Sequence, residues 1–250
     1  MGGITTDIRT GLAFCTRLPL GRAAAPEGAS LARASWTFPL IGALVGAIGA
    51  AVCWLADTVG LDPFVSATLA VAATLLVTGC LHEDGLADTA DGFGGGATKD
   101  RKLEIMRDSR SGAYGVAALV LSVLLRVAAI ASLADPVLVA AALIAAHAAA
   151  RATMPLFMLL VPAARRDGLS AGAGRPPLGS AIAAGVLGLL ALLLCLGVAA
   201  ALMAAMLVAA AVALMAWISL RQIGGQTGDV LGAVEQISEM LILLTASALL

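Results

Sequence analysis

The residues best suited to chemistry lie together in one short polar stretch between two apolar segments. Seven of the sixteen acidic residues fall within 26 positions of it: Glu83, Asp84, Asp88, Asp91, Asp100, Glu104 and Asp108. On a helix, Asp84, Asp88 and Asp91 would share one face, where their like charges repel. A divalent cation removes that repulsion, and Mg²⁺ takes oxygen ligands from a few carboxylates together with substrate phosphates. The spacing therefore favours a magnesium site, with a solvated charged loop as the alternative.

Glycines and basic residues follow these acids and suit the binding of phosphate. Gly92 and residues 94–96 are glycines, which let the backbone approach an anion closely. The basic side chains that come next can hold phosphate oxygens; they are Lys99, Arg101, Lys102, Arg107 and Arg110. Metal-assisted phosphoryl transfer consists mainly of positioning and charge neutralisation, so this is the chemistry that the combination predicts.

A second polar loop, residues 221–236, has similar chemistry. Its segment 224–229 (GGQTGD) is typical of a turn that ends at a helix N-cap, for which we expect Asp229. Glu235 and Glu239 follow at positions i and i+4 of that helix. The loop either contributes to the same site or only caps a helix whose acids are exposed.

The composition indicates what must position these residues. Of the 250 residues, 60% are apolar and 12% are charged, whereas a soluble domain has about 45–50% and about 25%. This excludes an ordinary soluble enzyme and a disordered chain, and it allows about seven transmembrane helices of about 20 residues each. The formal net charge of −1 provides no strongly basic surface, so no nucleic-acid partner is expected.

The apolar segments predict an all-α, polytopic membrane bundle of about seven spans (six to eight), forming a single domain over residues 1–250. Residues 1–35 are expected to be a cytoplasmic segment with a short amphipathic helix around 4–18. The run 178–220 is 43 residues long, too long for one crossing, and should form a tight hairpin of two. The other expected spans are 37–56, 63–81, 113–134, 136–161 and 237–250, the last with only 14 residues. The stretch 82–112 would then be the acidic catalytic loop.

Basic residues place the polar segments on one side of the membrane. Thirteen of the fifteen Lys and Arg residues precede the first span or lie in the three polar loops, whereas the opposite loops carry only Asp57, Asp62 and Asp135. Because positive residues are retained in the cytoplasm, we expect the N-terminus and the active site there. Arg126, Arg151 and His147 lie inside spans and should face protein or a polar cavity. Arg151 either contacts a substrate phosphate or pairs with backbone or an acid.

Four segments resemble the cobalamin synthase family (adenosylcobinamide-GDP ribazoletransferase) in sequence and in order. They are 82–115 (HEDGLADTADGFGGGATKDRKLEIMRDSRSGAYG), 224–239 (GGQTGDVLGAVEQISE), 14–19 (FCTRLP) and 164–169 (ARRDGL). The first motif is highly specific, the second moderately so, and the other two are weak alone. The resemblance covers the whole chain. Cys15, where leucine is more usual, is a mild departure outside the acidic stretch.

The resemblance implies a multi-pass enzyme of the cell inner membrane that requires Mg²⁺. The family joins adenosylcobinamide-GDP to α-ribazole, or to its 5′-phosphate, and releases GMP. On this basis the ribose 5′-oxygen of the acceptor would attack the phosphorus attached to the corrinoid, with Mg²⁺ bridging both phosphates. The expected partners are these two substrates and membrane lipid, and a homo-oligomer is left open.

The family's acidic motifs also imply roles for individual residues. They map onto Glu83, Asp84, Asp88, Asp91, Asp108 and Asp229. We expect the metal ligands to be Asp84, Asp88, Asp91 and Asp108. Glu83 lies about 100° around the helix from Asp84 and is the expected general base. The expected substrate-binding residues are Lys99, Arg107, Arg110, Arg151, Thr227 and Asp229.

Three other functions remain open from the residues themselves. A CDP-alcohol phosphotransferase shares fragments of its signature with Asp88-x-x-Asp91-Gly92 and Glu104-x-x-x-Asp108, but the Ala-Arg pair expected after the glycine is missing. An ion transporter would need carboxylates in mid-span, whereas the acids here are expected at a loop boundary. A structural membrane subunit would leave the acidic stripe without a role.

Overall fold

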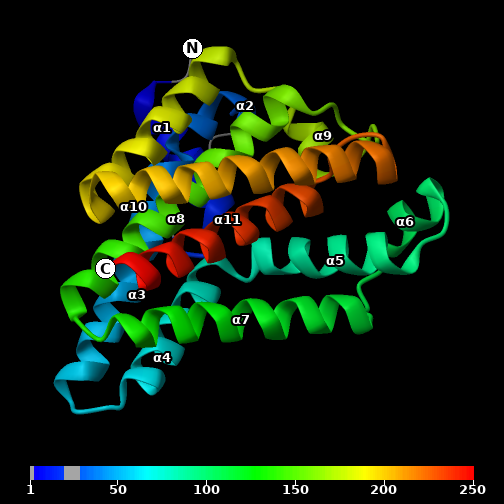
Figure 1. Cartoon of the computed structure of the whole chain (residues 1–250). Coiled ribbons are helices and arrows are strands. Elements are labelled where there is room, and N and C mark those ends of the chain that lie inside the picture. Colours follow the sequence, from blue (N-terminus) through cyan, green and yellow to red (C-terminus); the bar gives the residue numbers. More distant parts are fainter. Residues whose placement is uncertain (1–2, 20–28) are drawn as a thin grey trace.

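The computed structural model describes residues 3–19 and 29–250, and this part of the chain contains helices and no strand (Figure 1). The all-α prediction is confirmed. The predicted N-terminal helix is α1, although residues 20–28 of the predicted N-terminal segment lie outside the described residues. The elements are α1 (Ile4–Cys15), α2 (Leu31–Ala34), η2 (Ser35–Thr37), α3 (Phe38–Thr58), α4 (Pro63–Thr78), α5 (Leu81–Gly95), α6 (Lys99–Ile105), α7 (Ala113–Leu133), α8 (Pro136–Leu160), α9 (Leu169–Ala173), α10 (Leu178–Ile223) and α11 (Gly228–Leu249).

Several of these helices can cross a membrane. Within the described residues, five helical segments are long and apolar enough, and the bent pair α4–α5 makes a sixth if it crosses as one span. The polytopic bundle is therefore confirmed. The long α10 contains the predicted hairpin, and its helical course breaks at Gly197, where φ is 72°. Figure 1 shows its yellow and orange parts running in different directions from this break. If α4–α5 crosses as one span and the two parts of α10 cross separately, the count equals the expected seven.

The last helix is longer than its apolar run. We expected a polar loop up to residue 236 and a helix of 14 residues, but α11 begins at Gly228 and has 22 residues. The expectation was wrong because it placed polar side chains in a loop. Glu235, Gln236 and Glu239 are instead buried inside the bundle. The helix that carries them is long enough to span the membrane.

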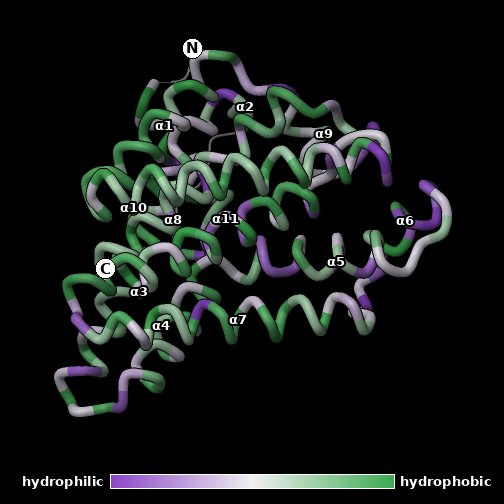
Figure 2. Tube along the Cα trace, in the orientation of Figure 1, coloured by the Kyte–Doolittle hydropathy of each residue, from purple (hydrophilic) through white to green (hydrophobic). Residues whose placement is uncertain are grey.

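The acidic stretch is also largely helical. α4 ends at Thr78, Gly79 and Cys80 take left-handed backbone, and α5 leaves at 90° to α4. α5 then packs against α7 and α11 (Figure 1), and Figure 2 shows polar positions of α5 among hydrophobic neighbours. The predicted loop at 82–112 is therefore corrected to α5, α6 and their connections, with α5 inside the bundle. The density of charge in this stretch predicts exposure, which the burial of much of α5 contradicts.

α8 lies at the centre of the bundle, in contact with α3, α10 and α11. Every residue of α8 from Ala145 to Pro155 is buried. Gly42 and Gly46 of α3 lie directly against the α8 backbone, so that any side chain there would collide with it. These small residues allow the close helix packing on which a membrane bundle depends.

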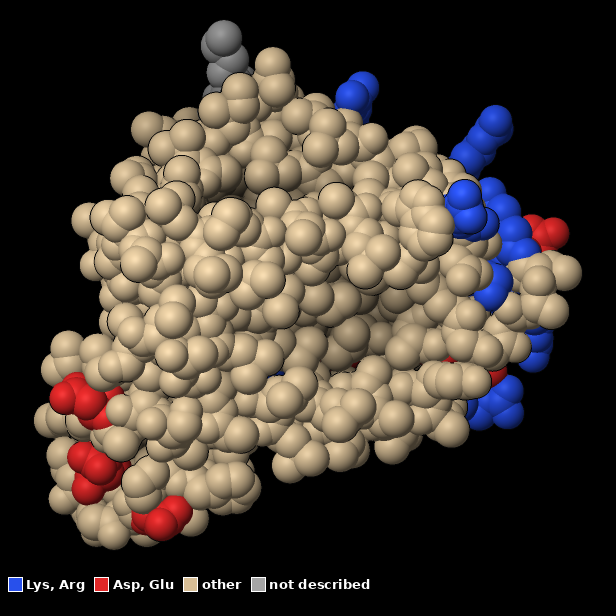
Figure 3. All heavy atoms as spheres, in the orientation of Figure 1, with Lys and Arg blue, Asp and Glu red and all other residues tan. Residues whose placement is uncertain are grey.

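Charged side chains gather at two opposite ends of the molecule. Figure 3 shows Lys and Arg side chains at the end that carries α6, and acidic side chains at the other end, near the α3–α4 turn. The surface between them is almost free of charge in this view, as expected for a surface in contact with lipid. The separation agrees with the sidedness predicted from the sequence.

Candidate active site

The candidate site lies where α5 touches the start of α11. A Cβ atom at Gly85 would lie 2.7 Å from the backbone oxygen of Asp229, and one at Gly232 would lie 3.0 Å from that of His82. The glycines therefore allow the two backbones to approach more closely than side chains would. Asp88 consequently lies within electrostatic range of Asp229, although the two residues are far apart in sequence.

We expect Gly85→Ala to push α5 away from α11, because the added methyl group meets backbone and not a flexible side chain. Overpacking of this kind costs about 1–3 kcal/mol, so the melting temperature in detergent and the turnover should both fall. Gly95→Ala is the matched control, since its methyl group finds its nearest neighbour, Ile105 Cδ1, only at 3.6 Å. Equal melting temperatures and turnover for the two variants would contradict the close contact.

Arg165 reaches the same place from a loop in which the sequence analysis selected no residue. Hydrogen bonds from Ala164 N to Gln226 O and from Gln226 N to Pro162 O, both 2.8 Å, join the loop after α8 to the turn before α11. Arg165 Nη2 then lies 3.5 Å from Asp229 Oδ2, and its Nη1 is buried without a hydrogen-bond partner. The only signal in the sequence was the weak motif at 164–169.

These groups lie at a cavity of about 250 Å³. Asp84, Asp229 and Arg165 line it, and most of the remaining lining is apolar. The larger apolar side chains are Phe14, Leu31, Phe38, Leu81, Met154, Met158 and Leu231. Pockets for small molecules are typically apolar clefts with a few convergent polar groups. The cavity therefore has the composition of a substrate site.

The carboxylates near the cavity are chemically suited to a hard cation. Asp88 is partly buried and feels the negative charges of Asp84, Asp229 and Asp91, with the charge of Arg165 opposing them. Oxygen ligands that repel one another suit Mg²⁺. Their oxygens do not yet converge, because the only close group of ligand atoms among the described residues lies elsewhere. The assignment of Asp84, Asp88 and Asp91 as ligands stays a prediction.

Asp91 also holds the start of α7. Its two carboxylate oxygens accept hydrogen bonds from Gly112 N at 2.7 Å and from Gly115 N at 2.8 Å. These amides belong to the first turn of a helix, where they have no partner within the helix and where a negative charge is favourable. No pattern in the sequence indicates this structural role, which Asp91 would combine with any binding of metal.

The predicted phosphate-binding residues Lys99, Arg107 and Arg110 lie at the exposed edge of the site, whereas Lys102 is buried and its Nζ donates to Phe93 O at 3.2 Å. Arg107 Nη2 donates to both carboxylate oxygens of Asp167, at 2.6 and 2.8 Å. Arg110 Nη2 donates to Asp108 Oδ2 at 2.6 Å, and its hydrogen bonds lower the pKa of Asp108 to about 2. Lys99 is also exposed. None of these residues lines the cavity, so their contacts with substrate and the metal-binding role of Asp108 stay predictions.

Thr227, and not Asp229, is the N-cap of α11. Thr227 Oγ1 accepts a hydrogen bond from Val230 N at 3.3 Å, and the same hydroxyl donates to Asp229 Oδ2 at 3.0 Å. The predicted cap was two residues late, because Thr227 has the extended backbone that a cap requires. Asp229 is therefore not needed as the cap and lines the cavity instead.

Glu83, the expected general base, belongs to a buried ionic network. Its Oε1 lies 3.0 Å from Arg126 Nη1, which is also 3.1 Å from Glu239 Oε1. Arg126 is only 1% exposed, so the expectation that it faces protein is confirmed. Glu83 neutralises this arginine and does not line the cavity. Its role as general base stays a prediction that the geometry does not favour.

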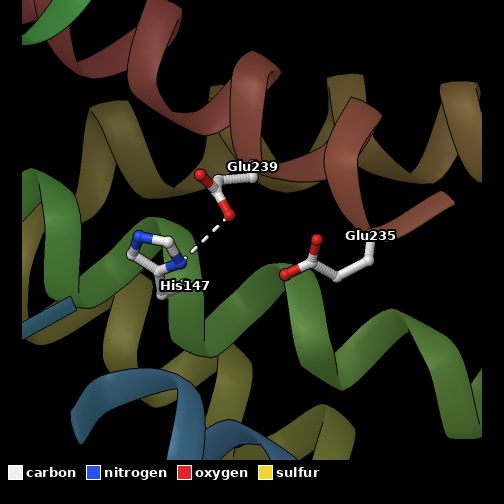
Figure 4. Close-up of side chains that lie close together, drawn as sticks. All are labelled: His147, Glu235 and Glu239. Atoms are coloured by element: carbon white, nitrogen blue, oxygen red, sulfur yellow. Dashed lines mark ion pairs between the residues drawn. The ribbon is translucent and has the colours of Figure 1, made fainter. Parts of the chain in front are cut away.

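The other half of the network joins α8 to α11 (Figure 4). His147 Nδ1 lies 3.0 Å from Glu239 Oε2. Arg151 Nη1 lies 2.7 Å from Glu235 Oε1. These are ion-pair distances, although both oxygens lie outside hydrogen-bond geometry. Arg151 is 1% exposed and does not line the cavity, so its observed contact is with an acid.

This network explains how the spans accommodate so many polar side chains. His147, Glu235 and Glu239 are the described group whose ligand atoms lie close enough to hold a metal. Arg126 and Arg151 already lie beside these carboxylates and offset two of the three negative charges of the network, which come from Glu83, Glu235 and Glu239. Carboxylates in mid-span are also what an ion transporter would need, but here they pair with arginine or histidine.

Comparison with known proteins identifies the family. A family model described as cobalamin-5-phosphate synthase matches residues 7–247. The chain belongs to that family. A curated relative from Bradyrhizobium diazoefficiens, named adenosylcobinamide-GDP ribazoletransferase, is 54% identical over 98% of this chain and 94% of its own length. Relatives of the same name from Mesorhizobium japonicum and Azorhizobium caulinodans are 51% and 48% identical, over 99% and 96% of this chain and 95% of each relative. No solved structure matches the chain.

The resemblance seen in the motifs is therefore confirmed, and the chain is a membrane transferase of cobalamin synthesis. The region matched by the cobalamin-5-phosphate synthase model includes α5, the start of α11 and the loop that carries Arg165. In this member of the family, those three segments meet at one cavity.

Proposed function

We propose that this protein is an adenosylcobinamide-GDP ribazoletransferase, which joins adenosylcobinamide-GDP to α-ribazole or its 5′-phosphate and releases GMP. The observation that carries the proposal is the convergence of Asp84, Asp229 and Arg165 at one cavity. It occurs in a chain that is 54% identical to a relative of that name. The cavity supplies an apolar surface for an organic substrate, and the charged groups suit a pyrophosphate.

The name of the family bears on which oxygen of the acceptor attacks. The family model is described as a cobalamin-5-phosphate synthase, so the product that it names carries a phosphate at the 5′ position of the ribose. An acceptor that already carries a 5′-phosphate has no free 5′-hydroxyl. We therefore replace the 5′-oxygen expected from the sequence by a hydroxyl of the ribose ring, which is available in both acceptors.

The chain's own residues can perform the transfer of the phosphate-linked group. The ribose oxygen bonds to the phosphorus attached to the corrinoid, the bridging P–O bond breaks, and GMP leaves with the bridging oxygen. Asp84 and Asp229 are the carboxylates placed at the cavity to accept the hydroxyl proton. The unpaired Nη1 of Arg165 is placed to hold a phosphate oxygen of the donor.

The proposal includes Mg²⁺, with Asp84 and Asp88 as the principal ligands and Asp91 and Asp108 as further ones. When bound, the ion would neutralise the pyrophosphate and stabilise the charge on the leaving phosphate. The support for it is the set of oxygen donors, which repel one another at the site.

The proposal also places the protein in the cell inner membrane with its site on the cytoplasmic side. The supporting observation is the cluster of Lys and Arg side chains at the α6 end of the molecule (Figure 3). Basic residues flanking spans are retained in the cytoplasm. Soluble substrates would then reach the cavity from the cytoplasm.

A comparison of donors tests the reaction class. Purified protein in lipid nanodiscs would receive Mg²⁺ and α-ribazole, with either adenosylcobinamide-GDP or CDP-diacylglycerol as the donor. We expect release of GMP from the first and no release of CMP from the second. Release of CMP without GMP would contradict the proposal and favour a CDP-alcohol phosphotransferase.

A further inference from the structure

We propose that the apolar part of the cavity binds the benzimidazole base of the acceptor, with His82 donating a hydrogen bond to its free ring nitrogen. The inference rests on the proposed function, because α-ribazole is a riboside of dimethylbenzimidazole. It assigns a binding role to His82, Phe14 and Phe38, which had none in the sequence analysis.

The walls of this cavity suit a flat aromatic group. Phe14 and Phe38 both line it and stack on each other, with ring centroids 5.5 Å apart and an interplanar angle of 14°. Met154 and Met158 add two thioethers. Aromatic rings and the polarizable sulfur of methionine both make favourable contacts with another aromatic ring.

The hydroxyl groups of the cavity are already committed to the protein. Ser35 Oγ donates to Ala32 O at 2.8 Å, and Ser170 Oγ donates to Gln226 Oε1 at 2.6 Å. Among the described lining residues, hydrogen-bonding groups for a base are therefore scarce away from the charged end. A guanine, with several donors and acceptors on its edge, would lose hydrogen bonds to water here. Dimethylbenzimidazole loses few, since it offers one free ring nitrogen and two methyl groups.

His82 is the buried polar group that matches this single nitrogen. Its Nδ1 accepts a hydrogen bond from Arg151 Nη2 at 3.4 Å. The same Nδ1 also lies 3.4 Å from Glu235 Oε2, but only its contact with Arg151 has hydrogen-bond geometry. Because arginine can only donate, we assign the imidazole proton to Nε2. His82 is only 3% exposed, lines the cavity, and its Nε2 has no hydrogen-bond partner. An unpaired buried donor costs free energy that a ligand with one acceptor recovers.

The size of the cavity agrees with this occupant. Its volume of about 250 Å³ is slightly below the roughly 300–1,000 Å³ of typical ligand pockets. It can hold a bicyclic base with part of its sugar, whereas the corrin ring of the donor is far too large. The ribose would then extend toward Asp84, Asp229 and Arg165, where the transfer takes place.

Two variants of the full chain in nanodiscs test the pocket by binding of the riboside alone, without donor or Mg²⁺. Ala173→Phe fills the cavity, whereas Ala171→Phe on the same short helix faces a neighbouring cavity and is the matched control. We expect calorimetry to show α-ribazole binding weakened at least about tenfold in Ala173→Phe and unchanged in Ala171→Phe. In Ala173→Phe, the riboside of unsubstituted benzimidazole should lose less affinity than α-ribazole does, because it lacks the two methyl groups.

His82 has a test of its own that loss of packing would not reproduce. The wild type should bind dimethylbenzimidazole riboside at least about tenfold more tightly than the riboside of dimethylindole, which lacks the acceptor nitrogen. His82→Phe should bind the two ribosides equally. Retained discrimination in a folded His82→Phe would overturn the role of His82.

Each remaining result separates the pocket from the proposed function. If the wild type turns over adenosylcobinamide-GDP but Ala173→Phe keeps its affinity and its KM for α-ribazole, the pocket assignment is wrong and the function stands. If GMP displaces the riboside and Ala173→Phe weakens the binding of GMP but not that of α-ribazole, the pocket binds the nucleotide of the donor. If the wild type neither binds α-ribazole nor releases GMP, the proposed function fails and this inference fails with it.

Discussion

Asp88→Asn is expected to lower the Mg²⁺-dependent turnover by about 100- to 1,000-fold, the usual cost of removing one electrostatic contact aimed at a reacting phosphate. The side chain keeps its shape but loses the charge that the neighbouring Asp84 and Asp229 oppose. Removing this charge relieves repulsion in the free protein. We therefore expect turnover to be lost while the melting temperature without Mg²⁺ stays the same or rises. The rise in melting temperature that Mg²⁺ causes should be smaller in this variant than in the wild type.

Asp100→Asn is the matched control, because it makes the same chemical change at an exposed position of α6. It should keep its turnover and its response to Mg²⁺. Asp91→Asn should behave differently from both variants, because Asp91 also accepts hydrogen bonds from Gly112 and Gly115. This variant should lose both turnover and thermal stability. Near-wild-type turnover in Asp88→Asn would disprove its assignment as a ligand.

Arg126→Met is expected to destabilise the bundle by about 3–5 kcal/mol, the usual cost of breaking a buried ion pair from one side. Glu83 and Glu239 would lose the guanidinium that lies within 3.1 Å of both. The melting temperature in detergent should fall by about 6–20 °C, by the scaling known for chains of this size.

Two further variants show whether the loss comes from unpaired charge. Arg101→Met removes an exposed arginine that pairs with Glu104, and it should cost less than about 1 kcal/mol. Adding Glu239→Gln to Arg126→Met removes one unpaired carboxylate and should recover part of the lost stability. Equal melting temperatures for Arg126→Met and the wild type would show that the ionic network does not stabilise the bundle. A double variant less stable than Arg126→Met would show that the loss does not come from unpaired carboxylates.

Local patterns in the sequence were sufficient for much of the scaffold. The spans expected at 113–134 and 136–161 became α7 and α8 with almost the same ends, because Gly112 and the Asp135–Pro136 pair bound the apolar runs. The expected break in the long apolar run corresponds to Gly197, where glycine readily takes a positive φ.

Long-range pairing of charges is what the sequence could not reveal. The sequence predicts a polar loop around Glu83 and a short terminal span around Glu239, and it indicates no partner for either carboxylate. Both carboxylates are buried because Arg126 contacts both of them. Arg126 lies 43 positions from Glu83 and 113 positions from Glu239 in the sequence. The same limit applies to Arg165, whose place beside Asp229 depends on hydrogen bonds between two loops. The sequence predicted the carboxylates of the site, but it did not predict which of them face the cavity.

The most direct test of the proposed function is the balance of products from the purified protein. The chain in nanodiscs would be incubated with adenosylcobinamide-GDP, α-ribazole and Mg²⁺, and both GMP and the cobalamin product would be quantified over time. We predict equal amounts of the two products, with neither formed when α-ribazole or Mg²⁺ is omitted. GMP formed at the same rate without α-ribazole would indicate hydrolysis of the donor, and this result, like the absence of GMP, would contradict the account.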